Sequence, residues 1–326
     1  MGGGLKKLGV VGTMIWDTII GRDPAAAPFE EWGGISYALA ALDASLPADW
    51  QVVPVVKVGR DLAERADDFL RTLPAARGTR FAVVPATNPR VRLNYQDRQR
   101  RCEGLTGGVP PWTWEELGPM VLDLDALYVN FITGFECDLA TAQALRQAYR
   151  RPLYGDLHSL ALGIRANGLR HLRPIEEPLA WLSCFDVVQV NEDEMLQLGD
   201  EPLALAARAV ARGVQAVCVT LGERGTAYVA APGFDGFGPA PAPAAADAGQ
   251  VVRTARIDAE GEPVVGDPTG CGDVFGSTLF ARLLAGDPLE PAVRAANRMA
   301  RRNVSYRGAT GLQHHLRGGL APSRSA

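Results

Sequence analysis

The chain has 326 residues, of which 47% are hydrophobic and 21% charged, and its formal net charge is −4. This composition excludes disordered and fibrous proteins, and the slight acidic excess argues against nucleic acid as a bulk partner, because phosphate backbones are bound by clustered basic residues. The length fits one large α/β domain, alone or with a small appendage.

The cysteines and the apolar runs narrow the class further. Five cysteines lie far apart without a Cys-x-x-Cys pair, which predicts neither a zinc site nor a disulfide framework: Cys102, Cys137, Cys184, Cys218 and Cys271. No signal-peptide pattern precedes the first apolar residues, and no run is long enough to span a membrane. We therefore expect a cytoplasmic protein with a small-molecule substrate.

The hydrophobic pattern predicts alternating strands and helices. It begins with a strand at 8–11, a helix at 35–46, a strand at 51–56 and a helix at 62–73. Short strands without intervening helices follow at 81–84, 90–95 and 98–102, which predicts a small β-sheet appendage. Alternation then returns with strands at 126–129, 153–154, 186–190, 215–220 and 226–230 and a helix at 139–150. This order predicts a parallel sheet covered on both faces, with a surface loop at 239–246 and a frayed tail after residue 313.

One glycine-rich run near the C-terminus carries the strongest chemical signal. Gly270, Cys271 and Gly272 precede an apolar helical pattern, so their backbone amides and the helix dipole form an anion site. Asp273, in the first helical turn, is placed to accept the proton of a hydroxyl that attacks a phosphoryl group. The alternative is a glycine-rich turn in which Asp273 only complements the helix dipole.

The order of motifs resembles the ribokinase-like, or PfkB, family of carbohydrate and nucleoside kinases. Residues 267–273 are similar to its signature Asp-Thr-x-Gly-Ala-Gly-Asp, which implies Asp273 as the catalytic base and the amides of Gly270, Cys271 and Gly272 as the anion hole. The resemblance implies a three-layer α/β/α sandwich with a mostly parallel central sheet. It further implies one domain over 1–326, with a β lid from about 80–108 and from short segments near 13–34.

Three segments resemble the family's substrate side. Residues 12–17 resemble its substrate-binding loop, with Asp17 accepting substrate hydroxyls, a chemistry that suits vicinal diols. Gly33 and Gly34 resemble its Gly-Gly substrate contact. Ribokinase-type members carry an asparagine four residues later, where this chain has Ala38 beside Ser36 and Tyr37, which weakens the case for ribose. Gly59 and Asp61 resemble the family's Val-Gly-x-Asp segment, although Asp61 also reads as a helix N-cap.

Other segments resemble the family's nucleotide side. Asn191 and Glu194 match an Asn-x-x-Glu motif that supports Mg²⁺ through water, and they also read as a capping box. The resemblance implies ATP contacts at the following residues: Asn191, Thr220, Gly222, Gly225 and Asn297. It also implies a monovalent cation, K⁺, held near Asp267 and Thr269 by the loop at 307–309.

Two features fall outside this pattern. The alternation at 90–95 places Arg90 and Arg92 on one strand face, with Arg98, Arg100 and Arg101 close behind. This cluster either clamps an anionic substrate or forms a solvated face that resists edge pairing. His158 follows Asp156 where many sugar kinases have an Asp-x-Asn segment, and it reads either as a phosphate or substrate contact or as a structural histidine.

The reading that combines these signals is ATP-dependent phosphorylation of a hydroxymethyl group on a small polyhydroxylated sugar or polyol. A nucleoside is the alternative acceptor, because the missing asparagine and Tyr37 leave room for a stacking base. A catalytically silent sugar-binding regulator on the same fold is a second alternative. A dinucleotide oxidoreductase is disfavoured, because residues 9–12 supply no glycine-rich turn. Exposed lid strands suggest a homodimer through the lid.

Overall fold

A computed structural model describes residues 4–20, 27–76, 81–95, 101–237 and 252–319. Its central sheet has the strand order β14-β13-β12-β11-β8-β7-β1-β3-β4. The strands from β12 to β4 pair in parallel, and β13 and β14 add an antiparallel edge. Their bounds are β1 Lys6–Ile20, β3 Trp50–Gly59, β4 Ala82–Val84, β7 Ala126–Asn130, β8 Leu153–Asp156, β11 Val187–Asn191, β12 Ala216–Thr220, β13 Thr226–Ala230 and β14 Arg253–Ile257.

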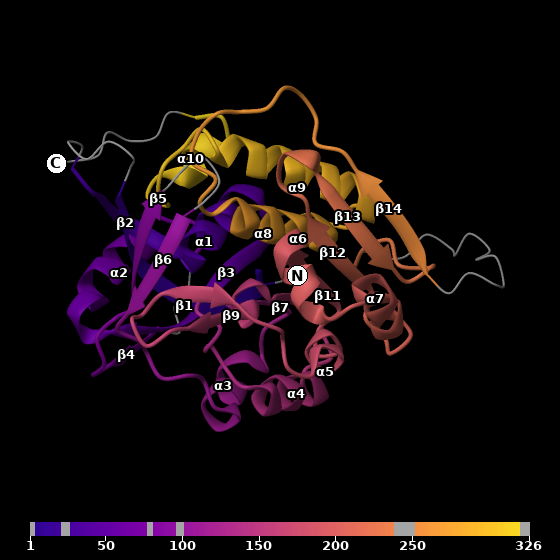
Figure 1. The fold of residues 1–326 in the computed structure, drawn as a ribbon, viewed down its shortest axis with the longest axis horizontal. Helices are drawn as coiled ribbons and strands as arrows, with labels where there is room; N and C mark the ends of the chain where they lie inside the picture. The colour runs from indigo at the N-terminus through magenta and orange to yellow at the C-terminus, as the bar shows by residue number, and fades with distance from the viewer. Residues whose placement is uncertain (1–3, 21–26, 77–80, 96–100, 238–251, 320–326) are drawn as a thin grey trace.

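Helices cover both faces of this sheet (Figure 1). One face carries α1 Ile35–Ser45, α2 Ala63–Arg71, α8 Cys271–Leu284, α9 Leu289–Asn303 and α10 Leu312–Leu316. The other carries α3 Trp114–Val121, α4 Leu139–Ala148, α5 Pro178–Leu182 and α7 Pro202–Val210. Neighbouring strand residues point to opposite cores, as with Val10 toward α8 and Val11 toward the α3 side. The predicted three-layer α/β/α sandwich with a mostly parallel sheet is thereby confirmed.

Local sequence explains how several elements begin and pack. Thr113 and Glu116 form a capping box at α3, and Asp138 caps α4 by accepting a hydrogen bond of 2.8 Å from the Thr141 amide. Gly155 in β8 leaves room for the Phe185 ring, which would lie 2.5 Å from a Cβ at that position. The two caps thus fix where α3 and α4 begin, and Gly155 lets the Phe185 ring pack against β8 next to Asp156.

The lid grows out of the central strand β1. Beyond Thr13 this strand pairs antiparallel with β2 Phe29–Gly34 and parallel with β5 Arg90–Tyr95, which pairs in turn with β6 Arg101–Thr106. Residues 12–17, expected to form a loop, therefore lie within a strand, because β3 pairs with Gly12 and Thr13 and β2 and β5 pair with the residues that follow. The strand expected at 98–102 starts at Arg101 among the described residues.

Two expectations concern segments outside the central sheet, the tail after residue 313 and the loop at 239–246. The tail after residue 313 was expected to fray, but it continues through α10, where Leu312, Gln313 and Leu316 are buried. The expected surface loop at 239–246 lies outside the described residues. Within the described chain, no helix combines the length and apolar character needed to cross a membrane.

Candidate active site

Polar side chains gather where parallel strands of the central sheet end. Asn130 ends β7 and Asp156 ends β8, and the two residues are paired in register; Asn191 ends β11 and pairs with Thr220 at the end of β12. Binding sites of parallel sheets form at this carboxyl edge. Helix α8 begins at the same edge. There the Asn130 side chain donates a hydrogen bond of 2.8 Å to Asp273 Oδ1.

The glycine-rich run forms the first turn of α8. Gly270 has φ of 78°, and a Cβ there would lie 2.3 Å from the Tyr37 ring, so glycine is required at this position. The Gly272 carbonyl accepts a hydrogen bond of 3.0 Å from Gln189 Nε2. The Cys271 amide donates to Pro268 O at 3.1 Å, and Gly272 lies in the first helical turn, where an amide has no acceptor within the helix itself. The turn is therefore suited to an anion.

Asn130 is a site residue that sequence reasoning missed. Its side chain is fully buried, and its Oδ1 has no hydrogen-bond partner among the described residues. Its Nδ2 donates to both Asp273 and the Tyr128 hydroxyl, and burial together with Asp156 and Asp273 raises the pKa of Tyr128. The available signal was an asparagine at the end of an otherwise apolar buried strand.

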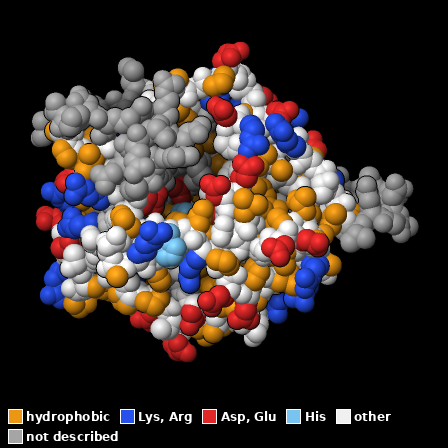
Figure 2. Space-filling view, viewed as in Figure 1, with side chains coloured by type: hydrophobic (Ala, Val, Ile, Leu, Met, Phe, Trp, Pro, Cys, Tyr) orange, Lys and Arg blue, Asp and Glu red, His pale blue; other side chains and the backbone are white. Residues whose placement is uncertain are grey.

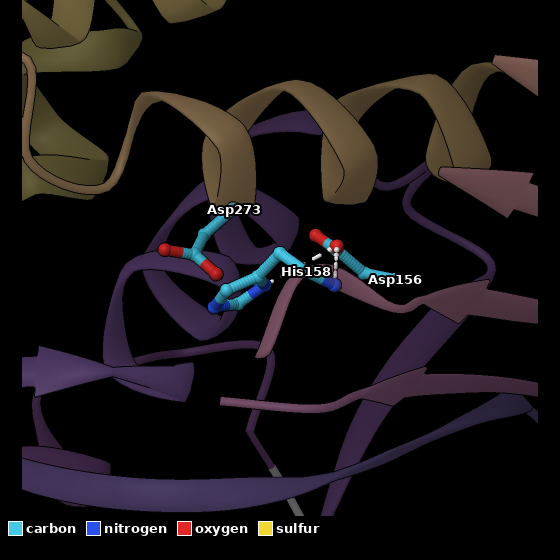
Figure 3. Close-up of side chains that lie close together, drawn as sticks. All are labelled: Asp156, His158 and Asp273. Carbon is cyan, nitrogen blue, oxygen red and sulfur yellow. Dashed lines mark hydrogen bonds and ion pairs between the residues drawn. The ribbon is translucent and has the colours of Figure 1, made fainter. Parts of the chain in front are cut away.

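His158 lies between two carboxylates (Figure 3). Its Nδ1 is 3.2 Å from Asp156 Oδ1, and its ring is directed toward Asp273. Burial lowers the pKa of His158, but Asp156, Asp273 and Glu194 outweigh burial and raise it to about 10. One ligand atom each from Asp156, His158 and Asp273 lies within 4.8 Å of the others, so the imidazole is close to two acidic groups.

On the acceptor side, Asp17 lies over Gly33. Asp17 is 5% exposed, and a Cβ on Gly33 would lie 1.8 Å from its Oδ2. The space left by the missing side chain is thus taken by the carboxylate of this chain. Gly34 approaches Thr13 O closely, since a Cβ there would lie 2.7 Å from that oxygen.

Tyr37 connects the two halves of the site. Its pKa is raised by burial and by the carboxylates of Asp17, Asp267, Asp273 and Glu31, so its hydroxyl faces acidic groups from both halves. At 2% exposed and packed against Gly270, its ring is not available to stack on a substrate base. The expectation that Tyr37 leaves room for a stacking base is therefore wrong, because the ring fills space in the core.

Gly59 and Asp61 hold the base of the lid. The Gly59 amide donates to Asn88 Oδ1 at 3.0 Å, and a Cβ at Gly59 would lie 2.2 Å from the Asn88 amide nitrogen. Asp61 accepts from the Asn88 amide at 2.8 Å and pairs with Arg90 at 2.7 Å. Burial raises the pKa of Asp61, but these two partners lower it more. Asp61 lies within the turn, whose N-cap is Gly59, so the expectation of Asp61 as N-cap is wrong.

Arg92 is exposed on β5, which agrees with a solvated strand face. Arg98 and Arg100 lie outside the described residues.

Asn191 and Glu194 form the capping box of the short helix α6 Glu192–Met195. The Asn191 amide donates to Glu194 Oε2 at 2.7 Å, and the Glu194 amide donates to Asn191 Oδ1 at 2.9 Å. Burial raises the pKa of Glu194 to about 7, although His158 and the Asn191 amide lower it in part. A carboxylate in this environment gains from a nearby cation.

The expected nucleotide-side residues lie around β12 and β13. Thr220 ends β12, Gly222 begins the following turn, and Gly225 packs so closely that a Cβ would lie 2.1 Å from Ile257 O. Asn297 accepts a hydrogen bond of 2.8 Å from the Thr226 hydroxyl and donates to Ile257 O at 3.4 Å. Its side chain thus ties α9 to the β13 and β14 edge.

Asp267 and Thr269 are bound within their own turn. Asp267 Oδ1 accepts from the Thr269 amide at 2.9 Å and from its hydroxyl at 2.6 Å. The Thr269 carbonyl accepts from Asn303 at 2.8 Å, and Arg307 Nε lies 3.7 Å from Asp267 Oδ2. Arg307 therefore supplies positive charge beside Asp267, and the K⁺ expected at this turn stays a prediction.

The surface and one cavity complete the picture. Figure 2 shows acidic side chains within a hollow near the middle of the face viewed. A cavity of about 100 Å³ lies beneath the lid, and its walls include Thr13, Leu105, Trp112, Phe135 and Ile164. This cavity is mainly apolar and adjoins β1 at the base of the lid.

Residues 166–315 match the family model described as pfkB family carbohydrate kinase. Over this region, just under half of the chain, the sequence is that of a pfkB family carbohydrate kinase. The match supports a phosphotransferase with an alcohol group as acceptor. The matched region includes α8 and the Asn191–Glu194 capping box, whereas Asp17 and the lid precede it.

Solved structures share the fold of this chain over most of its length at low sequence identity. A Burkholderia thailandensis nucleoside kinase in complex with inosine is 18% identical, with a TM-score of 0.68 over 94% of this chain and 93% of that one. A pyrophosphate-dependent kinase in the ribokinase family, complexed with a pyrophosphate analog and myo-inositol, is 15% identical, with a TM-score of 0.69 over 94% and 98%. Ribokinase from Thermotoga maritima is 16% identical, with a TM-score of 0.68 over 96% and 98%. No curated protein matches the sequence.

Proposed function

We propose that this chain transfers the γ-phosphoryl group of ATP to a hydroxymethyl group on a small sugar or polyol. The observation that carries the proposal is the placement of Asp273 in the first turn of α8, beside backbone amides and held by Asn130 at 2.8 Å. A carboxylate base next to an anion site is what phosphoryl transfer to an alcohol requires. The cytoplasm is the proposed location, since the reaction uses ATP.

In the proposed mechanism Asp17 holds vicinal hydroxyls of the acceptor, and the lid excludes water. Asp273 takes the proton of the attacking hydroxyl. The oxygen of that hydroxyl bonds to the γ-phosphorus, and the bond between the γ-phosphorus and the ADP oxygen breaks. The amides from Gly270 to Gly272 stabilise the charge on the phosphoryl oxygens, with that of Cys271 shared with Pro268 O. Gly33 contributes by leaving space for the Asp17 carboxylate.

Mg²⁺ fits the Glu194 side of the site. Burial disfavours the ionised form of Glu194, so a hydrated cation nearby would stabilise its carboxylate. Mg²⁺ keeps most of its waters and, when bound, would neutralise charge on the donor phosphates. Arg307 lies beside Asp267, and K⁺ there stays a prediction without a step in this mechanism.

The test is ATP-dependent ADP release across pentoses, hexoses, inositols, sugar phosphates and nucleosides, with pyrophosphate as a second donor. We expect Asp273→Asn to lower kcat by about 10²–10⁴-fold, the usual share of general base catalysis, while the acceptor KM stays within about threefold. Asp68→Asn is the matched control, because Asp68 is an exposed residue of α2. Near-normal turnover of Asp273→Asn would remove Asp273 from the mechanism.

A nucleoside acceptor is the second candidate, and the cavity beneath the lid favours it. Trp112 and Phe135 line this cavity, and Phe135 is 47% exposed. An aromatic base stacks well on such side chains. Phosphorylation of nucleosides but not of sugars or polyols in the same panel would select this candidate. Silence of every acceptor while ATP still binds would support the catalytically silent regulator.

A further inference from the structure

His158 is pinned in the centre of the site by its own neighbours. The Leu157 amide donates to Gln189 O at 3.0 Å and the Ser159 amide to Phe131 O at 3.1 Å, so the backbone on both sides of His158 is tied to the sheet. The Ser159 hydroxyl adds a bond of 2.7 Å to Ile132 O. The backbone of His158 is therefore held in place, and the contact of Nδ1 with Asp156 orients the ring.

The charges around this ring are arranged for a cation. Asp156 is 1% exposed, and its Oδ1 accepts from both the His158 amide at 3.3 Å and the ring Nδ1. Ligand atoms of His158 and of Asp273 in α8 lie within 4.8 Å of each other, and the charge of Glu194 in α6 also raises the pKa of the ring. The charge of Asp273 likewise raises the pKa of Tyr37 in α1 and of Tyr128 in β7. Among these groups the imidazole is the one that offers positive charge, and its pKa of about 10 keeps it protonated.

We propose that His158 is a positioning residue that orients the Asp273 carboxylate toward the acceptor hydroxyl and places a positive charge beside the phosphoryl group in transit. The proposal rests on the function proposed above. With Nδ1 held by Asp156, the opposite side of the ring is directed toward Asp273 (Figure 3). Together with Asn130, the ring would fix the carboxylate from two sides. A displaced base loses rate steeply, since small errors in geometry cost orders of magnitude.

The first test is the pH profile of kcat for His158→Gln, with His314→Gln as the matched control. His314 lies in α10, away from this site. A carboxylate that loses a neighbouring cation holds its proton more tightly, so the acid limb should move upward by about one to two pH units. At pH values below this limb, we expect kcat to fall by at least about tenfold, while the acceptor KM stays within about threefold. Asp156→Asn removes a negative charge while His158 stays protonated at acid pH, so this variant should not move the limb upward.

A second measurement needs no turnover. The chain has 4 histidines, so ring signals in ¹³C-histidine NMR can be assigned with His158→Gln. The His158 signal should titrate above the other histidines and move to lower pH in both Asp156→Asn and Asp273→Asn. An unmoved acid limb, or a His158 signal that ignores both substitutions, would overturn the proposal, even where a loss of stability lowers kcat. Activity retained by Asp273→Asn would instead refute the proposed function.

Discussion

At the scale of single residues, Gly33 gives the sharpest prediction. A Cβ at this position would lie 1.8 Å from Asp17 Oδ2, so Gly33→Ala must displace the carboxylate proposed to bind the acceptor. We expect the acceptor KM to rise by about tenfold or more with the ATP KM nearly unchanged, because lost substrate binding appears in KM. Gly104→Ala, in a lid strand where a Cβ meets no atom within 4 Å, is the control. Equal effects of the two variants would show that Asp17 tolerates the displacement.

Residues differ in how far the sequence can reveal them. Asp273 and its glycines are local in the chain, so a short pattern suffices to predict them. Asn130 is brought to Asp273 from 143 positions away, and nothing in its own segment announces that contact. Glu31 is similar, since it accepts a hydrogen bond of 2.7 Å from Thr310 near the other end of the chain. Pairings across such separations depend on the folded sheet.

At the scale of elements, the start of α8 depends on Gly270. Alanine there would strain the backbone at φ of 78° and meet the Tyr37 ring at 2.3 Å. Gly222 isolates the first effect, because its φ is 60° and a Cβ there meets nothing within 4 Å. Backbone strain alone costs about 1–2 kcal/mol. Urea unfolding should therefore show a larger loss for Gly270→Ala than for Gly222→Ala, and kcat of Gly270→Ala should fall as Asp273 shifts. Equal losses in the free energy of unfolding would mean that the Tyr37 ring moves aside at little cost.

Elements were predictable where periodicity is strong and failed where pairing partners decide. The apolar pattern predicts β7 and α1 closely, because their burial follows from their own sequence. In β1, by contrast, Gly12–Asp17 carries glycine and polar residues typical of a turn, yet it is extended because β3, β2 and β5 pair with it. β2 and β5 lie within the ranges predicted for the lid, but their role as a lid stays a prediction, as do the roles of Gly59 and Asp61 in substrate binding.

At the scale of the whole molecule, burial of Glu194 should make stability depend on pH. Its pKa rises from 4.5 to about 7 on folding, so the folded chain binds more protons than the unfolded chain between these values. Stability is then lost as pH rises through about 7. In the absence of Mg²⁺, we expect the difference in free energy of unfolding between wild type and Glu194→Gln to shift in favour of the variant as the pH rises from 4.5 to 8. The reason is that glutamine has no charge to bury.

The measurement is the free energy of urea unfolding at several pH values. Glu115→Gln is the control, since Glu115 occupies the first turn of α3 but is exposed. A constant difference between wild type and Glu194→Gln across this range would contradict the assigned burial effect.

The continuity of β1 constrains how the enzyme can open. A single strand, Lys6–Ile20, lies in the middle of the central sheet through its first half and carries Asp17 in its second. The lid is thus not joined to the central sheet by a flexible linker. Exchanging it between relatives as a separate module would interrupt the central strand β1. Any opening must bend or twist this strand, so a movement at Asp17, the proposed acceptor contact, would act directly on the central sheet.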